Sequence, residues 1–512
     1  MKNLGFVWVF IYATILFTAC KNPGNEMPQD QTPGPNIGGL GMPRGLINKT
    51  TEATPGYILF SPLLSATSYL VNLDGKVVHT WESEYGPSGW ILLKENGNLF
   101  RGGRQPDAPV FGGGGQGGRL QEFTWDGELI WDYRFASQEH LSHHDIAIMP
   151  NGNILVIAWE GKTPEEALKA GRKPELVPKA GLWPDKIVEL KPVGKNDAEI
   201  VWEWHLWDHL VQNYDQSKDN YGILSEHPEL LDINIGAPLP KPITLQELEA
   251  QRANNNAVTN STIDNAGSDL YHVNAIDYNE SLDQIVFSSP DLDEIFIIDH
   301  STSTSEAAGH TGGRWGKGGD FLYRWGNAAN YGRGDSTDPK IGGQHDVKWI
   351  PQGFPGGGHL MLFNNNVPNS TRPHSAVFEL ISPLTETGYE FLANGKFGPE
   401  EPHWKYVEAD TMAGYAPFIS GSHRMANGNT FVTIGPKGRY IEVNPQGKIV
   451  WEYWTPFAGY VKMKDGTFPQ PVGPFVYATF WSTHIPIDHP ALKGKALIPL
   501  DPQPEGYKEE KK

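Results

Sequence analysis

Four histidines share one position relative to the turns of short apolar strands in this 512-residue chain. Each stands six residues before a proline, or seven before an asparagine, where the innermost strand of a hairpin begins. The four are His144, His272, His345 and His484. Imidazoles that meet at one place could bind a transition metal, or could hold an oxyanion while one acts as nucleophile and another as general acid.

A fifth histidine, His423, lies near the corresponding position of its own hairpin but in a different register. It comes four residues before Asn427, whereas the register of the other four requires seven. An offset of three residues turns a side chain to the opposite face of a regular strand. We therefore expect His423 to reach the others only if its strand is shortened or carries a β-bulge.

Neighbouring residues favour different ligands for such a cluster. Asp145 and Asp346 directly follow two of the histidines, and carboxylates often support metal-bound imidazole. Arg372, in the segment NNNVPNSTRPHS, favours an anion, because a guanidinium matches tetrahedral oxyanions and repels a cation. If Arg372 shares the site, the metal interpretation fails.

A repeated hairpin pattern determines where these histidines lie. Short apolar strands joined by Asn-Gly, Asp-Gly and similar turns recur beyond residue 55, and such turns are strong hairpin signals. Pairs of hairpins start near residues 88, 142, 271, 344 and 420, and a sixth pair needs strands from both chain ends. The sequence predicts an all-β, six-bladed propeller over residues 55–505, with the first strand of each blade lining a central channel. A pair of β-sandwiches is the alternative.

Other segments are assigned to the periphery of this wheel. Insertions at 161–180 and 225–268 carry helical patterns and are predicted to be lids on one face. The run FGGGGQGG from residue 111 is predicted to be a flexible rim loop. The tryptophans that close outer hairpins are expected to pack between blades; they are Trp81, Trp131, Trp202 and Trp451.

The first residues have the pattern of an export signal. An apolar run over 5–19 ends in LFTAC, which predicts a lipoprotein-type signal peptide over 1–19 and lipidation at Cys20. A flexible tether over 20–54 and a charged tail over 506–512 complete the chain. The protein is expected in the cell envelope, as a periplasmic or outer-membrane lipoprotein; an ordinary secreted protein is the alternative. The net charge of −19 argues against nucleic acid and anionic membrane surfaces as partners.

Several segments resemble bacterial arylsulfotransferases of the phosphoadenosine-independent type, which use aryl sulfates as donors. They are residues 271–289, 299–327 and 342–350, and the LFNNN motif with Arg372. The similarity extends from about residue 56 to residue 500. It implies a six-bladed propeller that moves a sulfuryl group from a phenolic sulfate to another phenol, by a ping-pong route through a sulfated histidine.

The resemblance also implies roles for individual residues. By position, His423 matches the nucleophile of the family, whereas His272, His345 and Arg372 match sulfate-binding and proton-handling residues. His144 and Thr483 are placed in or near the pocket by register and proximity alone.

The expected partners are a small phenolic sulfate donor and a phenol acceptor, with no nucleotide, metal or redox cofactor. The chain lacks the cysteine pair of some members and has little room for their separate N-terminal β domain, which helps some of them dimerise. A homodimer is therefore left open. A propeller that only binds an anion or a partner is the alternative function. A quinone-dependent dehydrogenase is disfavoured, because its tryptophan-docking repeats and calcium-binding carboxylates are not found in the sequence.

Overall fold

The computed structural model describes residues 36–63, 65–235, 262, 264–458 and 475–509. The predicted signal peptide and Cys20 lie outside these residues, so export and lipidation stay predictions. No helix in the described part of the chain is long and apolar enough to span a bilayer.

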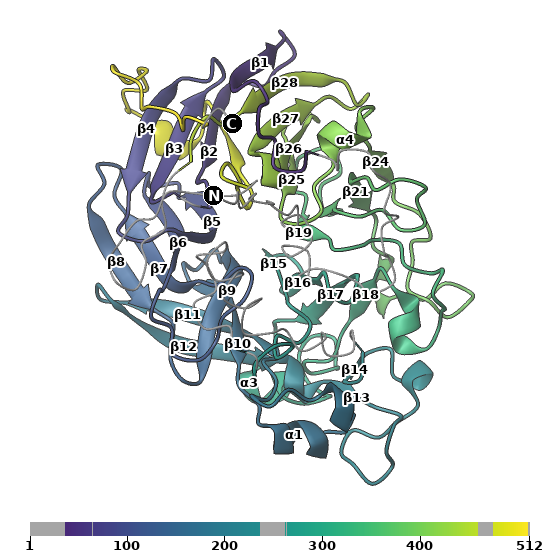
Figure 1. Ribbon diagram of the computed structural model, residues 1–512. Helices are drawn as coiled ribbons and strands as arrows, with labels where there is room; N and C mark the ends of the chain where they lie inside the picture. Colours follow the sequence, from purple (N-terminus) through teal and green to yellow (C-terminus); the bar gives the residue numbers. More distant parts are fainter. Residues whose placement is uncertain (1–35, 64, 236–261, 263, 459–474, 510–512) are drawn as a thin grey trace, which may run out of the picture.

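Six antiparallel sheets stand around a central axis, as the hairpin pattern predicts (Figure 1). Each sheet presents one short strand to the axis. The inner strands are β29 (Thr483–Pro486), β5 (Pro87–Leu93), β9 (His140–Ile148), β15 (Ala275–Asn279), β19 (His345–Trp349) and β25 (Gly421–Arg424). The six-bladed propeller is thereby confirmed.

The remaining strands follow outward within each blade. In chain order they are β2 (Gly56–Phe60), β3 (Thr67–Asn72), β4 (Val77–Glu82); β6 (Leu99–Arg104), β7 (Gly118–Phe123), β8 (Leu129–Arg134); β10 (Ile154–Glu160), β11 (Asp185–Val193), β12 (Asp197–His205); β16 (Gln284–Ser289), β17 (Glu294–Asp299), β18 (Tyr323–Trp325); β20 (Leu360–Asn364), β21 (Ala376–Leu380), β24 (Trp404–Tyr406); and β26 (Thr430–Ile434), β27 (Arg439–Val443), β28 (Ile449–Trp454).

Both chain ends close the ring. β29 pairs with β2, so the inner strand of that blade comes from the C-terminal part of the chain and the other three from the N-terminal part. In addition, β1 (Gly45–Lys49) pairs with β28 as a fifth strand of the neighbouring blade. The predicted flexible tether is therefore wrong for residues 45–49. The predicted charged tail also makes contacts, because Glu509 accepts hydrogen bonds from Gly41 N–H and the Tyr477 hydroxyl.

Turn chemistry and tryptophan packing both follow the sequence pattern. Gly97 and Gly152, in the Asn-Gly turns of two inner hairpins, have φ of 89° and 86°, a conformation that favours glycine. The outer-strand tryptophans donate their indole N–H across blade boundaries. The acceptors are Thr124 O for Trp81, Asp197 O for Trp131, Thr302 Oγ1 for Trp202 and Leu73 O for Trp451. The predicted blade packing is confirmed.

Short elements occupy the insertions and connections. They are α1 (Pro164–Lys169), α3 (Thr304–Ala307), α4 (Thr411–Gly414), the small pairs β13 (Leu210–Val211) with β14 (Leu231–Asp232) and β22 (Leu384–Thr385) with β23 (Gly388–Tyr389), and the 3₁₀ turns η1 (Pro174–Leu176), η2 (Leu206–Asp208), η3 (Leu224–Glu226), η4 (Ala328–Tyr331), η5 (Gly435–Lys437) and η6 (Pro490–Leu492).

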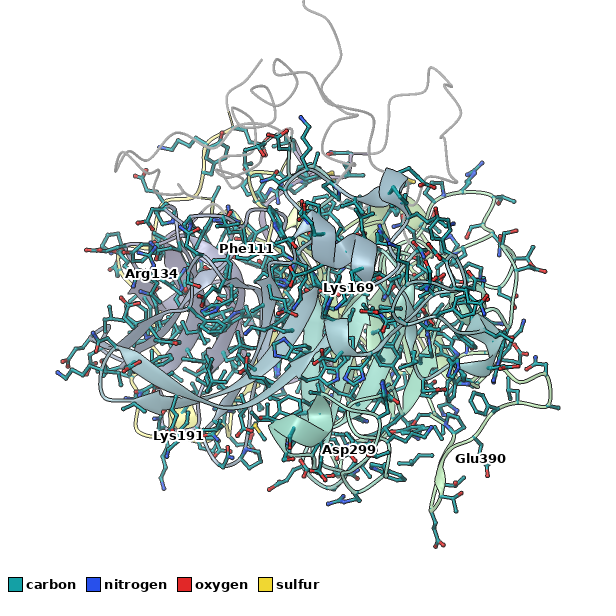
Figure 2. The ribbon with its side chains drawn as sticks, turned by 90° about the horizontal axis from the view of Figure 1, so that it is seen from below. Phe111, Arg134, Lys169, Lys191, Asp299 and Glu390 are labelled. Carbon is teal, nitrogen blue, oxygen red and sulfur yellow. The ribbon has the colours of Figure 1, made fainter. Side chains whose placement is uncertain are left out.

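One predicted lid can be compared with the structure. Lys169 of α1 lies toward the same face of the wheel as Phe111 (Figure 2), but α1 stands at the outer rim and not over the axis (Figure 1). The other helical pattern, at 244–252, falls outside the described residues.

Candidate active site

Three histidines meet near the axis. His144 and His345 belong to the inner strands β9 and β19, and His272 precedes β15. All three are buried, and the ring centroids of His144 and His272 are 4.4 Å apart in an edge-to-face arrangement. The Phe480 ring contacts the cluster, with its centroid 5.9 Å from that of His144 and 6.0 Å from that of His345. The predicted convergence is confirmed for these three.

Local backbone geometry directs these side chains. His144 and His272 have φ of 52° and 51°, in the left-handed region that residues with a Cβ seldom adopt. The pairing of β9 with β10 is also irregular around His144, and that of β19 with β20 is irregular directly after His345. Such bulges re-aim side chains next to functional sites. Two such unfavourable conformations at one place are typical of a site that the surrounding fold holds in position.

His272 carries the positive charge of the cluster. Its Nδ1 lies 2.5 Å from Asp269 Oδ2, and the other oxygen of Asp269 accepts from the Trp159 indole at 2.9 Å. Burial alone would lower the pKa of His272, but Asp269, with Asp291 and Asp185, raises it to about 9. His272 is therefore an imidazolium at neutral pH, with Nδ1–H donated to Asp269 and a second proton on Nε2.

A second chain of polar groups lies behind His144. Its Nδ1 is 2.7 Å from His143 Nδ1, and His143 Nε2 is 2.9 Å from Asp185 Oδ1. The two atoms are close but not aligned for a hydrogen bond, and neither has a hydrogen-bond partner among the described residues. Asp185 Oδ2 accepts from Val273 N–H, which fixes the carboxyl group. We call Asp185, His143 and His144 the relay.

The charge on Asp185, 2.9 Å from His143 Nε2, biases the tautomer of His144. Burial lowers the pKa of His143 to about 3, so its ring holds one proton. Ionised Asp185 favours that proton on His143 Nε2; His144 then donates from Nδ1, and His144 Nε2 keeps a free lone pair. When Asp185 is protonated, the order reverses and His144 Nε2 carries hydrogen. Burial and the nearby Asp269 raise the pKa of Asp185, so this switch occurs above the ordinary aspartate range.

His345 is present in the cluster, but its nitrogens are already occupied. Nδ1 faces Gly343 O and Asn365 Oδ1, both at 2.9 Å, so it must carry hydrogen. Nε2 accepts from Ile419 N–H at 3.2 Å, and burial lowers the pKa of the ring to about 4. His345 is therefore a neutral, fully bonded wall of the site. The predicted proton-handling role stays a prediction that this bonding disfavours.

The glycine-rich loop lies against the histidines. Gly115 accepts from His144 N–H, and a Cβ built on Gly115 would lie 2.3 Å from His144 Nε2. A Cβ on Gly114 would lie 3.3 Å from His272 Cε1. The expectation of a flexible rim loop is wrong for these two residues, because only glycine allows the backbone to come this close.

The close contact between Gly115 and His144 predicts that a methyl group added at residue 115 will strongly lower activity. Gly115→Ala should displace the His144 ring and lower kcat by about 10²-fold, as small misplacements of reacting groups do. Gly152→Ala is the matched control, because Gly152 has a similar positive φ (86° against 70° for Gly115) and its Cβ would meet no atom within 4 Å. Steady-state kinetics of both variants provide the measurement, and equal losses would contradict the contact.

His423 and His484 do not join the cluster. β25 pairs with β26 in regular register, without the bulge that His423 would need. Instead, His423 Nε2 accepts from His484 N–H at 3.3 Å, and its ring packs near Phe431. The expected convergence of His423 is therefore wrong, and its nucleophilic role stays a prediction without this geometric support.

The register predicted for His484 is wrong, because its hairpin differs from the others. Its ring faces Thr54 O, and Phe480 occupies the place near the axis instead. The proline used for its alignment, Pro490, begins η6 and does not form a hairpin turn. Thr483 is half-buried on the same strand, two residues from Ile485, and makes no side-chain hydrogen bond within the described residues. Its proposed place in the pocket is untested.

The aspartates beside the histidines have a different use from the expected one. Each accepts a backbone N–H of the next inner strand: Ile276 for Asp145, and Ser422 for Asp346. Asp277 accepts from Trp349 in the same way. The contact of His423 with His484 N–H continues this series between the last two blades. These groups hold inner strands together and do not support the cluster histidines.

Arg372 is exposed and has no side-chain hydrogen bond or ion pair in the described part of the chain. No hydrogen bond or ion pair among the described residues joins Arg372 to the histidine cluster. The expectation that Arg372 selects an anion there is therefore unsupported. Asn365, from the same asparagine run, reaches the site through His345 and also donates to Ala416 O and Ile419 O.

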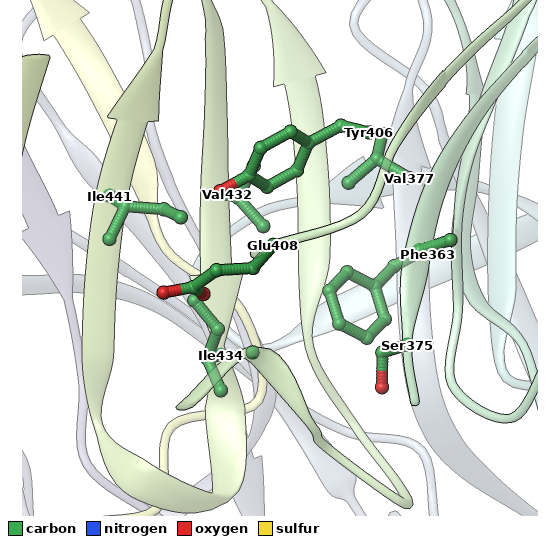
Figure 3. Close-up of a pocket in the computed structure, with 10 residues that line it drawn as sticks. Phe363, Ser375, Val377, Tyr406, Glu408, Val432, Ile434 and Ile441 are labelled. Carbon is green, nitrogen blue, oxygen red and sulfur yellow. The ribbon is translucent and has the colours of Figure 1, made fainter. Parts of the chain in front are cut away.

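A cavity elsewhere is too small for a substrate. It lies between the blades of β21 and β26 and is lined by apolar residues with Glu408 (Figure 3). Its volume of about 10 Å³ fits roughly one water molecule. Glu408 is paired with Arg439 through both oxygens, so it has no free charge to offer a ligand.

Comparison with known proteins now identifies the family. Residues 69–453 match the family model described as arylsulfotransferase (ASST). The chain belongs to the arylsulfotransferase family. A comparison with curated proteins gives no match.

Three solved structures are distantly similar to this arylsulfotransferase family member. A protein of unknown function from Bacteroides caccae is 10% identical, with a TM-score of 0.39, and the match covers 84% of this chain and 99% of that one. An inactive virginiamycin B lyase from Staphylococcus aureus with quinupristin is 11% identical, with a TM-score of 0.33 and coverages of 82% and 90%. The Dos1 propeller is 9% identical, with a TM-score of 0.31 and coverages of 84% and 81%.

The cluster suits the anion that an arylsulfotransferase handles. His272 supplies one positive charge, and His144 Nε2 can be a free lone pair beside it. Of the ring nitrogens of His144, His272 and His345, only the Nε2 atoms of His144 and His272 have no hydrogen-bond partner among the described residues. Both nitrogens of His345 already make hydrogen bonds. A metal at the cluster would thus find two free imidazole ligands, one of them on a cationic ring. Sequence reasoning missed the residues behind them; the pair His143-His144 was a signal, but Asp185 and Asp269 carried none.

Proposed function

We propose that the protein transfers a sulfuryl group from a phenolic sulfate ester to a phenol, by a ping-pong route through a sulfohistidine at His144. The pairing of a neutral imidazole with an imidazolium 4.4 Å away is the observation that carries the proposal. Membership of the arylsulfotransferase family supports the reaction class.

In the first half-reaction, His144 Nε2 attacks sulfur while the bond from sulfur to the phenolic oxygen breaks. The leaving oxygen takes the Nε2 proton of His272 and departs as a phenol. Sulfuryl transfer, like phosphoryl transfer, has a loose in-line transition state with charge on the equatorial oxygens. An imidazolium fixed beside that group stabilises the charge, and such donors are typically worth about 10²–10³ in rate.

The second half-reaction reverses the first with a new phenol. Neutral His272 Nε2 removes the acceptor's hydroxyl proton, its oxygen attacks sulfur, and the N–S bond to His144 breaks. The same group acts as acid and then as base, as microscopic reversibility requires. His144 and His272 return to their starting protonation states, so neither half-reaction consumes a nucleotide or redox equivalent.

The relay prepares His144 for this attack. Ionised Asp185 holds the proton of His143 on Nε2, which draws the Nδ1 proton of His144 toward His143. The lone pair of His144 then remains on Nε2, next to His272. Asp185 and His143 are positioning residues in this scheme, since neither touches the substrate.

The scheme predicts a bell-shaped pH dependence of kcat/KM. Catalysis needs His272 protonated, and its pKa is raised to about 9, so activity should fall as the pH rises through about 9. It also needs Asp185 ionised, and because burial raises the pKa of Asp185, activity should fall as the pH drops, at a value above the ordinary aspartate range. His272→Asn should remove the alkaline limb. An unchanged alkaline limb in that variant would contradict the assignment.

The reaction is tested with a chromogenic aryl sulfate, with and without a phenol acceptor. Acceptor-dependent release of the chromophore, together with a sulfated peptide around His144 trapped with donor alone, is the expected result. Absence of release with every acceptor would favour the alternative, a propeller that only binds an anion or a partner.

Export and anchoring at Cys20 belong to the same proposal and are tested by radiolabelled palmitate incorporation into wild type and Cys20→Ser.

A further inference from the structure

A second cluster of histidine and carboxylate lies between two blades, apart from the axis. His209 follows η2 at the end of β12, whereas His310 and Asp320 belong to the segment between α3 and β18. The Nδ1 atoms of both histidines lie 2.8 Å from Asp320 Oδ1. One ligand atom from each residue lies within 4.8 Å of the other two.

Hydrogen bonding fixes the tautomer of His209. Its Nε2 lies 2.8 Å from Ala307 O, and because a carbonyl oxygen only accepts, Nε2 must carry hydrogen. A neutral His209 then points the lone pair of Nδ1 at a carboxylate oxygen 2.8 Å away. Two lone pairs that face each other at this distance repel, so either a proton shared by the two groups or a bound cation must join them.

The surroundings hold the three groups in place for a cation. His209 is fully buried and stacks on Trp204, with the rings 5.5 Å apart and nearly parallel. A cation would share two imidazoles and a carboxylate, and could keep water on the side of His310, whose side chain is 59% exposed. A histidine that donates its other N–H to a backbone carbonyl is also the usual arrangement of a metal ligand.

We propose that His209, His310 and Asp320 bind a divalent cation of the zinc class. Two imidazoles and one carboxylate are ligands that zinc takes readily, and three protein ligands leave a position for water. The cation would tie the end of β12 to the segment before β18. This proposal stands independently of the proposed transferase reaction, because none of the three residues contacts the axial histidines.

Another cluster of two histidines and a carboxylate is a weaker candidate for a cation site. His359 Nδ1 lies 2.7 Å from Glu379 Oε1, with His403 nearby. The other oxygen of Glu379 is paired with the buried guanidinium of Arg424. That carboxylate is already neutralised by a fixed cation, so it attracts a metal less strongly than Asp320 does.

The test measures zinc binding by the full-length protein after dialysis against a chelator. Equilibrium dialysis with Zn²⁺ should show one bound equivalent that is lost in His310→Ala. Zinc in about 100-fold excess over Kd should raise the unfolding midpoint of wild type by roughly 2–5 °C. His310 is mostly exposed, so this variant is expected to fold.

His227→Ala is the matched control. His227 also pairs with a single carboxylate, Glu229, through Nδ1 at 3.0 Å, but has no second histidine beside it. This variant should keep the bound equivalent and the midpoint shift. Equal zinc binding and equal midpoint shifts in wild type and His310→Ala would overturn the proposal, as would the absence of a bound equivalent in wild type.

Discussion

His144→Asn should lose about 10⁶ in kcat, which is the size of effect seen when a catalytic nucleophile is removed. Asparagine is the appropriate replacement because His144 has φ of 52°, and asparagine tolerates this region better than most residues. The variant should therefore fold, yet have no nitrogen lone pair beside His272. Donor-only incubation should give no sulfated protein.

His423→Asn provides the decisive comparison, because the resemblance of residues predicts the nucleophile at residue 423. In the structure His423 accepts a backbone N–H of the next blade and lies beside Phe431. We expect a far smaller loss of kcat in this variant, with a lower unfolding midpoint. The opposite ranking, with His423→Asn inactive and His144→Asn active, would return the nucleophile to residue 423 and rule out the scheme based on His144.

The sequence predicted the wheel because its signals are local. An Asn-Gly turn needs positive φ wherever it occurs, and the apolar strands around it have one way to bury both faces. Counting residues back from those turns therefore located His144, His272 and His345 correctly. The count failed for His484, since Pro490 begins a 3₁₀ turn and not a hairpin. The spacing from His484 to Pro490 equals that from His144 to Pro150, so the sequence alone does not distinguish the 3₁₀ turn from a hairpin turn.

The rest of the site depends on contacts that no local pattern encodes. Asp185 is 42 residues from His143 along the chain and reaches it only because β11 and β9 belong to one blade. Asp269 meets His272 across a short turn, but its partner Trp159 comes from β10. Irregular pairing accompanies the two inner-strand histidines of the cluster, whereas β25, which carries His423, pairs regularly. Pairing register of this kind becomes visible only in three dimensions.

Asp185→Asn should lower kcat by about 10³–10⁴-fold while leaving the fold intact, by the reasoning that applies to the aspartate of a serine protease triad. Asp185 Oδ2 accepts from Val273 N–H, so the amide oxygen of asparagine will take that place. Its NH₂ group then faces His143 Nε2 and donates to it. His143 must carry its proton on Nδ1 and donate to His144, which leaves hydrogen on His144 Nε2 and no lone pair for sulfur.

The control for this substitution is Asp277→Asn, which also replaces a buried carboxylate that accepts a backbone N–H, from Trp349 at 2.8 Å, but faces no histidine. It should affect the unfolding midpoint more than kcat.

Asp185→Asn should in addition lose the acid limb of the pH profile, because the group that titrates there is gone. A purely structural role for Asp185 would lower the midpoint and keep that limb. Retention of the acid limb, or of kcat within about tenfold of wild type, would show that the tautomer of His144 is set by something other than the relay.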